Sequence, residues 1–220
     1  MEIHELAADA WRLAEREPGP RVVLGLVGPP AAGKSTLARA LVAEVERRRG
    51  PGAAGYLPLD GFHLSNAQLD RLGLASRKGS APSFDVHGYA ALLHRTVTET
   101  GHAIYVPDYD RTLHEPVAAR HLIRPGTRLV VTEGNYLACD EPGWTAARRW
   151  MAEVWYVDAP VEVRDRRLVA RQLAGGRTAA EARAWVDTND RPNGEQVERV
   201  RGNCDRVLPP IGLDISNGRD

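Results

Sequence analysis

The residues with the most informative types and spacing form a glycine-rich loop. Residues 28–35 read G-P-P-A-A-G-K-S and fit the phosphate-binding pattern G-x-x-x-x-G-K-[ST]. Backbone N–H groups of such a loop point at phosphate oxygens, the lysine reaches the β- and γ-phosphates, and the serine binds Mg²⁺. The residues predicted to hold the nucleotide here are Gly28, Pro29, Pro30, Ala31, Ala32, Gly33, Lys34, Ser35 and Thr36.

The segments on either side of this loop agree with that interpretation. An apolar, β-branched run at 22–27 precedes it, and a helix-like stretch leaves it and continues to about residue 48. Strand, glycine loop and helix are the arrangement that the motif requires. A chance Gly/Pro-rich turn before a helix is the alternative, and it does not explain why strand, pattern and helix coincide.

Two acidic residues stand where apolar runs end. Asp60 follows the predicted strand 55–59, and Glu133 follows the strand 128–132. Asp60 could act as base for an attacking hydroxyl or help hold Mg²⁺, and Glu133 could bind Mg²⁺ or position the acceptor. The plain alternatives are a turn aspartate that caps Gly61 and a strand-end acid that caps the next turn.

Basic residues gather in two later segments. Arg164, Arg167 and Arg171 share one face of a predicted helix at 161–174, as expected for a lid over phosphates. The alternative is a solvated basic face paired with Glu162 and Asp165. The short loop Arg77-Lys78-Gly79 suits an acidic or phosphorylated substrate, and an ordinary exposed turn explains it equally well.

The overall composition narrows the function classes. The 220 residues carry 29 acidic and 29 basic side chains, so the formal net charge is zero. This balance does not favour nucleic-acid binding, and no apolar run approaches the ~18 residues of a membrane span. Two distant cysteines and an acidic N-terminus indicate a cytoplasmic protein. The histidines show no zinc-binding spacing.

The order of elements predicts an α/β fold. Strands at 22–27, 55–59, 103–106, 128–132, 154–157 and 206–208 alternate with helices, which implies a parallel sheet of about five strands with helices on both faces. We expect one domain, 1–220. Its parts are an N-terminal helix within 1–20, a core at 22–160 with an acceptor-binding insert at about 61–90, and an arginine-bearing lid at 161–190. The amphipathic helix 3–16 could pack on its own domain or form a homodimer.

Five motifs in order resemble one family. G-x-x-x-x-G-K-S, L-D-G-F-H, R-K-G-S-A-P-S-F-D, V-P-D-Y-D-R and V-T-E-G-N-Y-L are similar to motifs of the uridine kinase, pantothenate kinase and phosphoribulokinase group of P-loop kinases. Within that group the chain resembles the bacterial nucleoside/nucleotide kinase branch, whose members are also labelled fructose-transport-system kinases. The resemblance runs from about residue 22 to the lid, and it implies the P-loop NTPase fold.

The resemblance also implies roles for single residues. Asp60 matches the catalytic base, and Lys34 matches the phosphate-binding lysine. Arg167, Arg171 and Arg177 match lid arginines, the first two as catalytic residues and the third as a nucleotide contact. Ser35 and Glu133 would hold Mg²⁺. The residues expected to bind the acceptor are His63, Lys78, Asp85, Tyr109, Arg111, His114 and Glu133.

The expected activity is transfer of the γ-phosphoryl group of ATP, with Mg²⁺, to a hydroxyl of a small molecule. The acceptor would be a sugar, a nucleoside or a pantothenate-like acid. Two departures bear on this choice: D-G-F-H replaces the D-S-F-Y of uridine kinases, and Asp108 stands where those enzymes have valine. The rival expectation is a regulatory or metallochaperone-type P-loop ATPase that acts on a protein partner. Preference for adenine or guanine stays open.

Overall fold

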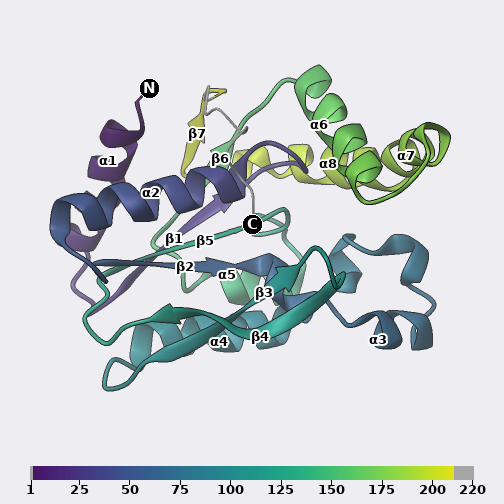
Figure 1. Cartoon of the computed structure of the whole chain (residues 1–220). Coiled ribbons are helices and arrows are strands. Elements are labelled where there is room, and N and C mark those ends of the chain that lie inside the picture. Colours follow the sequence, from purple (N-terminus) through teal and green to yellow (C-terminus); the bar gives the residue numbers. More distant parts are fainter. Residues whose placement is uncertain (1, 211–220) are drawn as a thin grey trace.

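A parallel sheet forms the centre of the molecule, which the computed structural model describes over residues 2–210 (Figure 1). The strand order is β2-β5-β1-β6-β7, and all four pairings are parallel. This confirms the predicted α/β fold with about five sheet strands. The sheet strands are β1 (Val22–Val27), β2 (Ala54–Pro58), β5 (Leu129–Gly134), β6 (Glu153–Val157) and β7 (Arg206–Leu208).

Alternate residues of the central strands enter two hydrophobic cores. On β1, Val23 and Val27 face one core, while Leu24 and Leu26 face the other. Successive side chains of a strand point to opposite faces of a sheet, so a strand covered on both faces must be apolar throughout. That is why the predicted strands of this sheet appear as continuous apolar runs.

Helices cover both faces of the sheet. Residues of α1 and α2 line one core, and residues of α4 and α5 line the other (Figure 1). The α1 helix packs on its own domain, because Leu6, Ala10 and Leu13 are buried there. The helices are α1 (Ile3–Arg16), α2 (Lys34–Arg49), α3 (Asn66–Arg71), α4 (Val86–Thr98), α5 (Pro142–Arg148), α6 (Val161–Ala174), α7 (Ala179–Trp185) and α8 (Arg191–Arg199). None in residues 2–210 has the length and apolarity needed to cross a membrane.

The predicted strand 103–106 lies outside the central sheet. It forms part of β3 (Ile104–Asp110), which pairs antiparallel with β4 (Glu115–Ile123) in a separate two-stranded sheet. A short turn can join antiparallel neighbours, whereas a parallel pairing needs a long crossover. The β4 strand was not predicted from the sequence, because most of its residues are half-buried or exposed and lack an apolar pattern.

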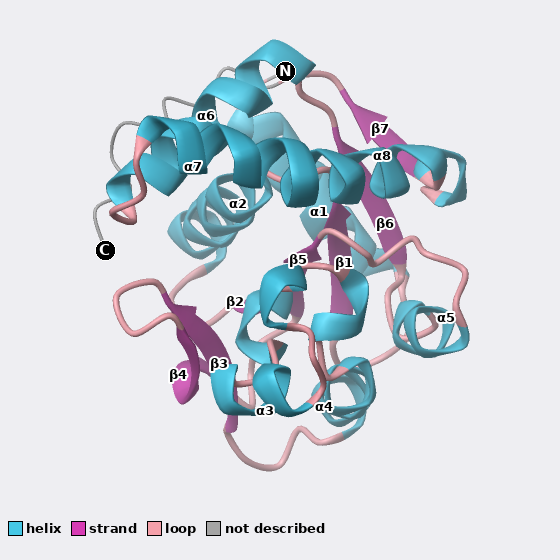
Figure 2. Cartoon of the chain, turned by 90° about the vertical axis from the view of Figure 1, so that its right-hand side faces the viewer, coloured by secondary structure: helices cyan, strands magenta, loops and turns pink. Residues whose placement is uncertain are grey.

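Two segments flank the carboxyl ends of the sheet strands. An insert runs from a 3-10 turn (Leu59–Phe62) through α3 to the start of α4. On the opposite side lie α6, α7 and a π-helical turn (Val186–Asp190) that leads into α8 (Figure 2). The second lid helix was expected from 178 to about 187, and α7 itself ends at Trp185.

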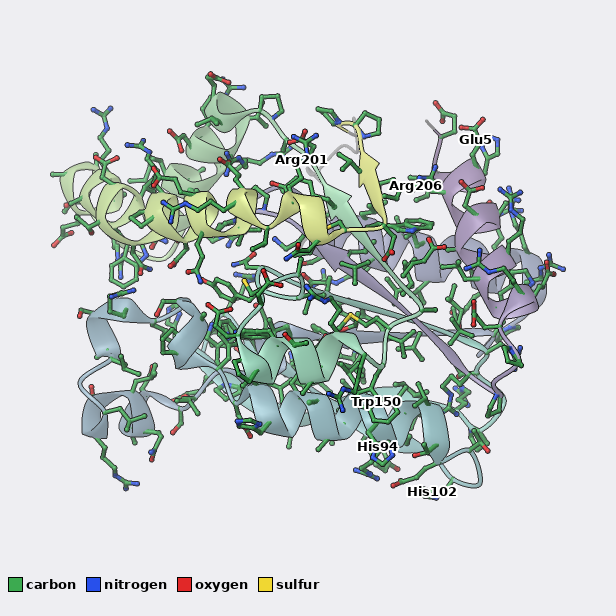
Figure 3. All side chains as sticks on the ribbon, turned by 180° about the vertical axis from the view of Figure 1, so that it is seen from behind. Glu5, His94, His102, Trp150, Arg201 and Arg206 are labelled. Atoms are coloured by element: carbon green, nitrogen blue, oxygen red, sulfur yellow. The ribbon has the colours of Figure 1, made fainter. Side chains whose placement is uncertain are left out.

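One aromatic pair joins α4 to the segment after α5. The ring centres of His94 on α4 and Trp150 after α5 lie 4.5 Å apart, and Figure 3 labels both. Ligands of open parallel α/β sheets bind beyond the carboxyl ends of the strands, so the polar groups at that edge are the candidates for a site.

Candidate active site

The phosphate-binding loop connects β1 to α2 through close backbone contacts. A Cβ added to Gly28 would lie 2.5 Å from the carbonyl oxygen of Val157, so only glycine fits there. Gly33 has a φ of 98°, a conformation that glycine adopts without steric cost. The loop conformation is thus built into the backbone and leaves its N–H groups at the start of α2.

Lys34 is buried at the first position of α2 and bends back over the loop. Its Nζ donates a hydrogen bond to the carbonyl oxygen of Pro29 at 3.0 Å. Burial lowers the Lys34 pKa to about 8, while the charges of Glu133 and Asp60 oppose that shift and Arg171 adds to it. Two carboxylates and one lid arginine therefore act electrostatically on the same ammonium group.

Glu133 is held by two hydroxyl groups. Ser35 Oγ donates to its Oε1 at 3.0 Å, and the Tyr56 hydroxyl donates to the same oxygen at 2.8 Å. Burial is the main cause that raises the Glu133 pKa, and the negative charge of Asp60 adds to the shift. A cation placed here would relieve both effects. Mg²⁺ prefers oxygen ligands and binds through one or two carboxylates plus phosphates, so Ser35 and Glu133 fit it.

Asp60 lies in the 3-10 turn that follows β2, with its carboxylate partly exposed. Within residues 2–210 this carboxylate accepts no hydrogen bond, and its ion partner is Arg111, with Nη2 3.8 Å from Oδ2. The capping of Gly61 that the sequence left open does not occur. The backbone carbonyl of Asp60 accepts a hydrogen bond from His63 Nδ1 at 2.8 Å, which fixes the turn. The side chain is free to meet a ligand.

The expected acceptor-side residues come from the insert and from the β3–β4 hairpin. The His63 ring lies 4.1 Å from Phe84 and 4.9 Å from Tyr109, and burial lowers the His63 pKa. Lys78 Nζ lies 5.1 Å from the centre of the Tyr109 ring and donates to the His114 carbonyl oxygen at 2.7 Å. His114 contributes its backbone to this cluster, at the exposed tip of the hairpin.

Asp85 has a structural contact of its own. Its exposed carboxylate accepts a hydrogen bond from the Gly88 N–H at 2.8 Å and so caps the start of α4. Binding of the acceptor by Asp85 stays a prediction that depends on the family resemblance.

The three arginines on one face of α6 have three different environments. Arg164 is buried and pairs with Glu198 on α8. Arg167 donates to the carbonyl oxygen of Ala31 in the phosphate loop at 3.1 Å. Arg171, one turn further, is exposed and close enough to affect Lys34. The basic face of α6 is therefore not uniformly exposed to solvent.

Arg177 lies beyond α6, with its guanidinium 3.8 Å from the centre of the Trp185 ring on α7. This contact joins the loop between α6 and α7 to the end of α7. A role for Arg177 in binding the nucleotide stays a prediction.

Several site residues were missed from the sequence. Tyr56, which holds Glu133, sits inside a strand that shows only an apolar pattern. His121 Nε2 pairs with Asp108 Oδ2 at 2.8 Å, which explains the acid at a position where uridine kinases have valine. Asn189 of the lid donates to the Lys78 carbonyl oxygen at 3.0 Å. The Asp108 departure was a usable signal for the first pair, whereas no local pattern indicates that Asn189 bonds to Lys78.

The glycine of D-G-F-H also has a structural cause. A Cβ on Gly61 would lie 2.4 Å from the carbonyl oxygen of Pro107 on β3. The turn that carries Asp60 is therefore packed directly against the hairpin backbone, and a serine does not fit without movement.

Comparisons with known proteins identify the family. No protein-family model matches the sequence. The chain is 31% identical over 199 residues to a Schizosaccharomyces pombe protein named "Putative uridine kinase", covering 88% of this chain and 85% of that protein. It is 35% identical over 196 residues to the uncharacterized protein YggC of Escherichia coli, covering 89% and 78%. Further relatives are named ATP-dependent kinases.

A solved structure extends the likeness to three dimensions. A "putative fructose transport system kinase" from Silicibacter sp. TM1040 superimposes with a TM-score of 0.85 at 32% identity, covering 95% of this chain and 100% of that one. Sequence relatives and fold point in one direction, and the chain belongs to the P-loop kinases of the uridine kinase group.

Proposed function

We propose that the protein transfers the γ-phosphoryl group of ATP to a hydroxyl group of a small metabolite. The observation that carries the proposal is the position of Asp60. Its carboxylate accepts no hydrogen bond within residues 2–210, and its charge acts on both Lys34 and Glu133 of the nucleotide side. A free carboxylate facing the phosphate-binding groups suits a base for an incoming hydroxyl.

Each of these groups has a role in the proposed reaction. The acceptor oxygen attacks the γ-phosphorus, the bond to the β,γ-bridging oxygen breaks, ADP leaves, and Asp60 takes the hydroxyl proton. Lys34 and the loop N–H groups hold the phosphates, while Arg171 faces the charge that spreads over the transferred group.

The nucleotide side needs a metal ion to complete it. Ser35 and Glu133 would hold Mg²⁺, which would supply positive charge to stabilise the phosphates. Arg167 keeps α6 against the loop through the Ala31 carbonyl oxygen. The names of relatives support two acceptor classes, nucleosides and sugars, and the basic insert supports a third, acids of the pantothenate type.

ATP consumption decides between this function and a protein-directed ATPase. ADP release is measured with the protein alone, with a mixture of sugars, nucleosides and vitamin precursors, and with a protein fraction from a lysate. Stimulation by one small molecule, with a phosphorylated product seen by mass spectrometry, is the expected result. Stimulation by protein alone, with inorganic phosphate as product, would refute the kinase proposal.

A further inference from the structure

Three cationic side chains from three separate elements approach the acceptor side of Asp60. Arg111 comes from the end of the β3–β4 hairpin, Lys78 from the insert and Arg171 from α6 of the lid. Arg111 lies 3.8 Å from the Asp60 carboxylate. Lys78 is linked to the site through Tyr109, and the charge of Arg171 interacts with those of Arg111 and Asp60. The positive charge therefore converges where an acceptor must bind.

These cations are poorly neutralised by the protein. Among residues 2–210, no carboxylate lies within 4 Å of Lys78 or Arg171, and Lys78 donates to the neutral oxygens of Asn66 and His114. The Arg111–Asp60 separation of 3.8 Å is too long for a hydrogen bond. Glu115, whose charge acts on Lys78, accepts hydrogen bonds from the Asn66 N–H instead. Asp190 and Glu133 act on Arg171 at longer range. Lys78 and Arg171 therefore lack a close counter-ion among the described residues.

The aromatic surface at this site is already covered. Lys78 stands over the Tyr109 ring, and His63 is tilted against the same ring at 4.9 Å. A nucleobase could stack on the face under Lys78 only by displacing that ammonium group, with the loss of a cation–π contact. A compact anion, in contrast, gains from the same groups.

We propose that the phosphoryl acceptor carries an anionic group, a carboxylate or a phosphate, next to the hydroxyl that is phosphorylated, and that Arg111 and Lys78 hold this group. The inference rests on the proposed kinase function and names its substrate class: sugar acids, small hydroxy acids or sugar phosphates. Arg111 is 57% exposed and can turn to a ligand. An acceptor anion that draws Arg111 away from Asp60 also frees the base to take the proton.

The test compares acidic with neutral acceptors in two arginine variants. ADP release is measured with D-glycerate, D-gluconate, fructose 1-phosphate, fructose and uridine. Arg111→Gln removes the proposed anion contact. Arg120→Gln is the matched control, because Arg120 lies on the same hairpin, is 50% exposed and pairs with Asp110 at 3.3 Å instead of Asp60.

We expect an acidic acceptor to give the highest kcat/KM. Arg111→Gln should raise its KM about tenfold or more, as loss of a charge-assisted hydrogen bond does, with the KM for ATP unchanged. Arg120→Gln should match the wild type. Comparison of D-glycerate and D-gluconate with fructose 1-phosphate shows whether a carboxylate or a phosphate is used. Preference for fructose or uridine, or an equal loss with neutral and acidic acceptors in Arg111→Gln, would overturn the anion assignment and leave the kinase function standing.

Direct binding separates failure of the inference from failure of the kinase proposal. Calorimetry measures binding of D-gluconate and fructose 1-phosphate to the protein with a non-hydrolysable ATP analogue and Mg²⁺. If no acceptor releases ADP but an anion binds and Arg111→Gln abolishes that binding, the anion site stands and the kinase proposal falls. If neither anion binds and none stimulates ADP release, the anion site is refuted.

Discussion

The two lysines of the sequence, Lys34 and Lys78, lie on the proposed nucleotide and acceptor sides of the site, and their surroundings differ. Lys34 is 6% exposed, and the backbone of its own loop accepts its hydrogen bond. Lys78 is only partly buried, and its ammonium group donates to the Asn66 side chain of α3 and to the His114 backbone of the hairpin. Lys34 is thus buried and bound within its own loop, whereas Lys78 is half-buried and held by two separate segments.

The difference shows how each side obtains its shape. On the nucleotide side one loop of consecutive residues sets the geometry, and Glu133 arrives from the neighbouring strand of the same sheet. On the acceptor side the 3-10 turn of Asp60 packs against a hairpin that belongs to a separate sheet. Chemistry that is common to a family can reside in the nucleotide side, while the choice of substrate can change through the acceptor side.

The largest expected effect separates chemistry from nucleotide binding. Asp60→Asn removes the proposed base and should lower turnover about 10²–10⁴-fold, because general base catalysis contributes that much. ATP affinity, measured by calorimetry, should stay close to that of the wild type. Asp110→Asn, on the adjoining hairpin, is the control for loss of one negative charge. Wild-type turnover in Asp60→Asn would show that the open carboxylate is not the base.

The two lysines can be compared by the same substitution. Lys34→Met should weaken ATP binding about 10–100-fold, since it removes a charged hydrogen-bond donor to phosphate. Lys78→Met should leave ATP binding unchanged and raise the KM for the acceptor. Calorimetry with ATP and Mg²⁺ measures the first effect, and steady-state kinetics the second. Equal losses of ATP affinity in both variants would contradict the assignment of Lys34 to the nucleotide side and Lys78 to the acceptor side.

Gly61 tests whether the acceptor side depends on the hairpin. Gly61→Ser, which restores the residue of uridine kinases, forces a Cβ against Pro107 and should cost about 1–3 kcal/mol of unfolding free energy. The shifted turn should also lower turnover. Urea unfolding measures the first effect, with Gly101→Ser as control because no atom lies within 4 Å of a Cβ there. Unchanged stability in Gly61→Ser would mean that the turn adjusts freely.

The smallest expected effect concerns Asp190, which lies in the lid. Burial raises the Asp190 pKa to about 6, and Arg171 opposes that shift. Between pH 4 and 6 the folded state keeps this proton while the unfolded state loses it, so the Asp190 contribution to stability falls as the pH rises through that window. Asp190→Asn should therefore gain about 1 kcal/mol relative to wild type between pH 4 and pH 7, less than the full shift implies because Asp190 is partly exposed.

Urea unfolding at several pH values checks this prediction, with Asp187→Asn in the same turn as the control for an exposed carboxylate. The informative quantity is the stability difference between Asp190→Asn and wild type at each pH. A difference that does not change between pH 4 and 7 would contradict the raised pKa of the half-buried Asp190 carboxylate.

The features that could be predicted from the sequence are those that depend on neighbouring residues. The central sheet was predictable because its strands are apolar on both faces, and the phosphate loop because its geometry depends on consecutive residues. The N-terminal helix 3–16 was predicted with both its ends, since its apolar residues repeat at helical spacing. Each of these features is encoded locally.

The residue types of the site were predictable, but the long-range contacts that hold them were not. Tyr56 and His121 act through partners 77 and 13 positions away, and no local pattern announces such contacts. The strand at 103–106 was assigned to the wrong sheet because its buried residues Ile104 and Val106 look like those of a central strand. Pairing choice is a tertiary property, and β4 supplied the partner that the sequence pattern did not show.

The hydrogen bond from Asn189 to the Lys78 backbone joins the lid to the acceptor insert. In the proposed reaction the lid arginines face the nucleotide, and a lid movement that admits ATP would then strain or release this bond. The free energies of binding would be linked: a nucleotide that favours the bonded arrangement would raise the affinity for the acceptor, and the acceptor would raise the affinity for the nucleotide by the same factor. One amide side chain would thus make the binding of the two proposed substrates reciprocal, although they share no atom of contact.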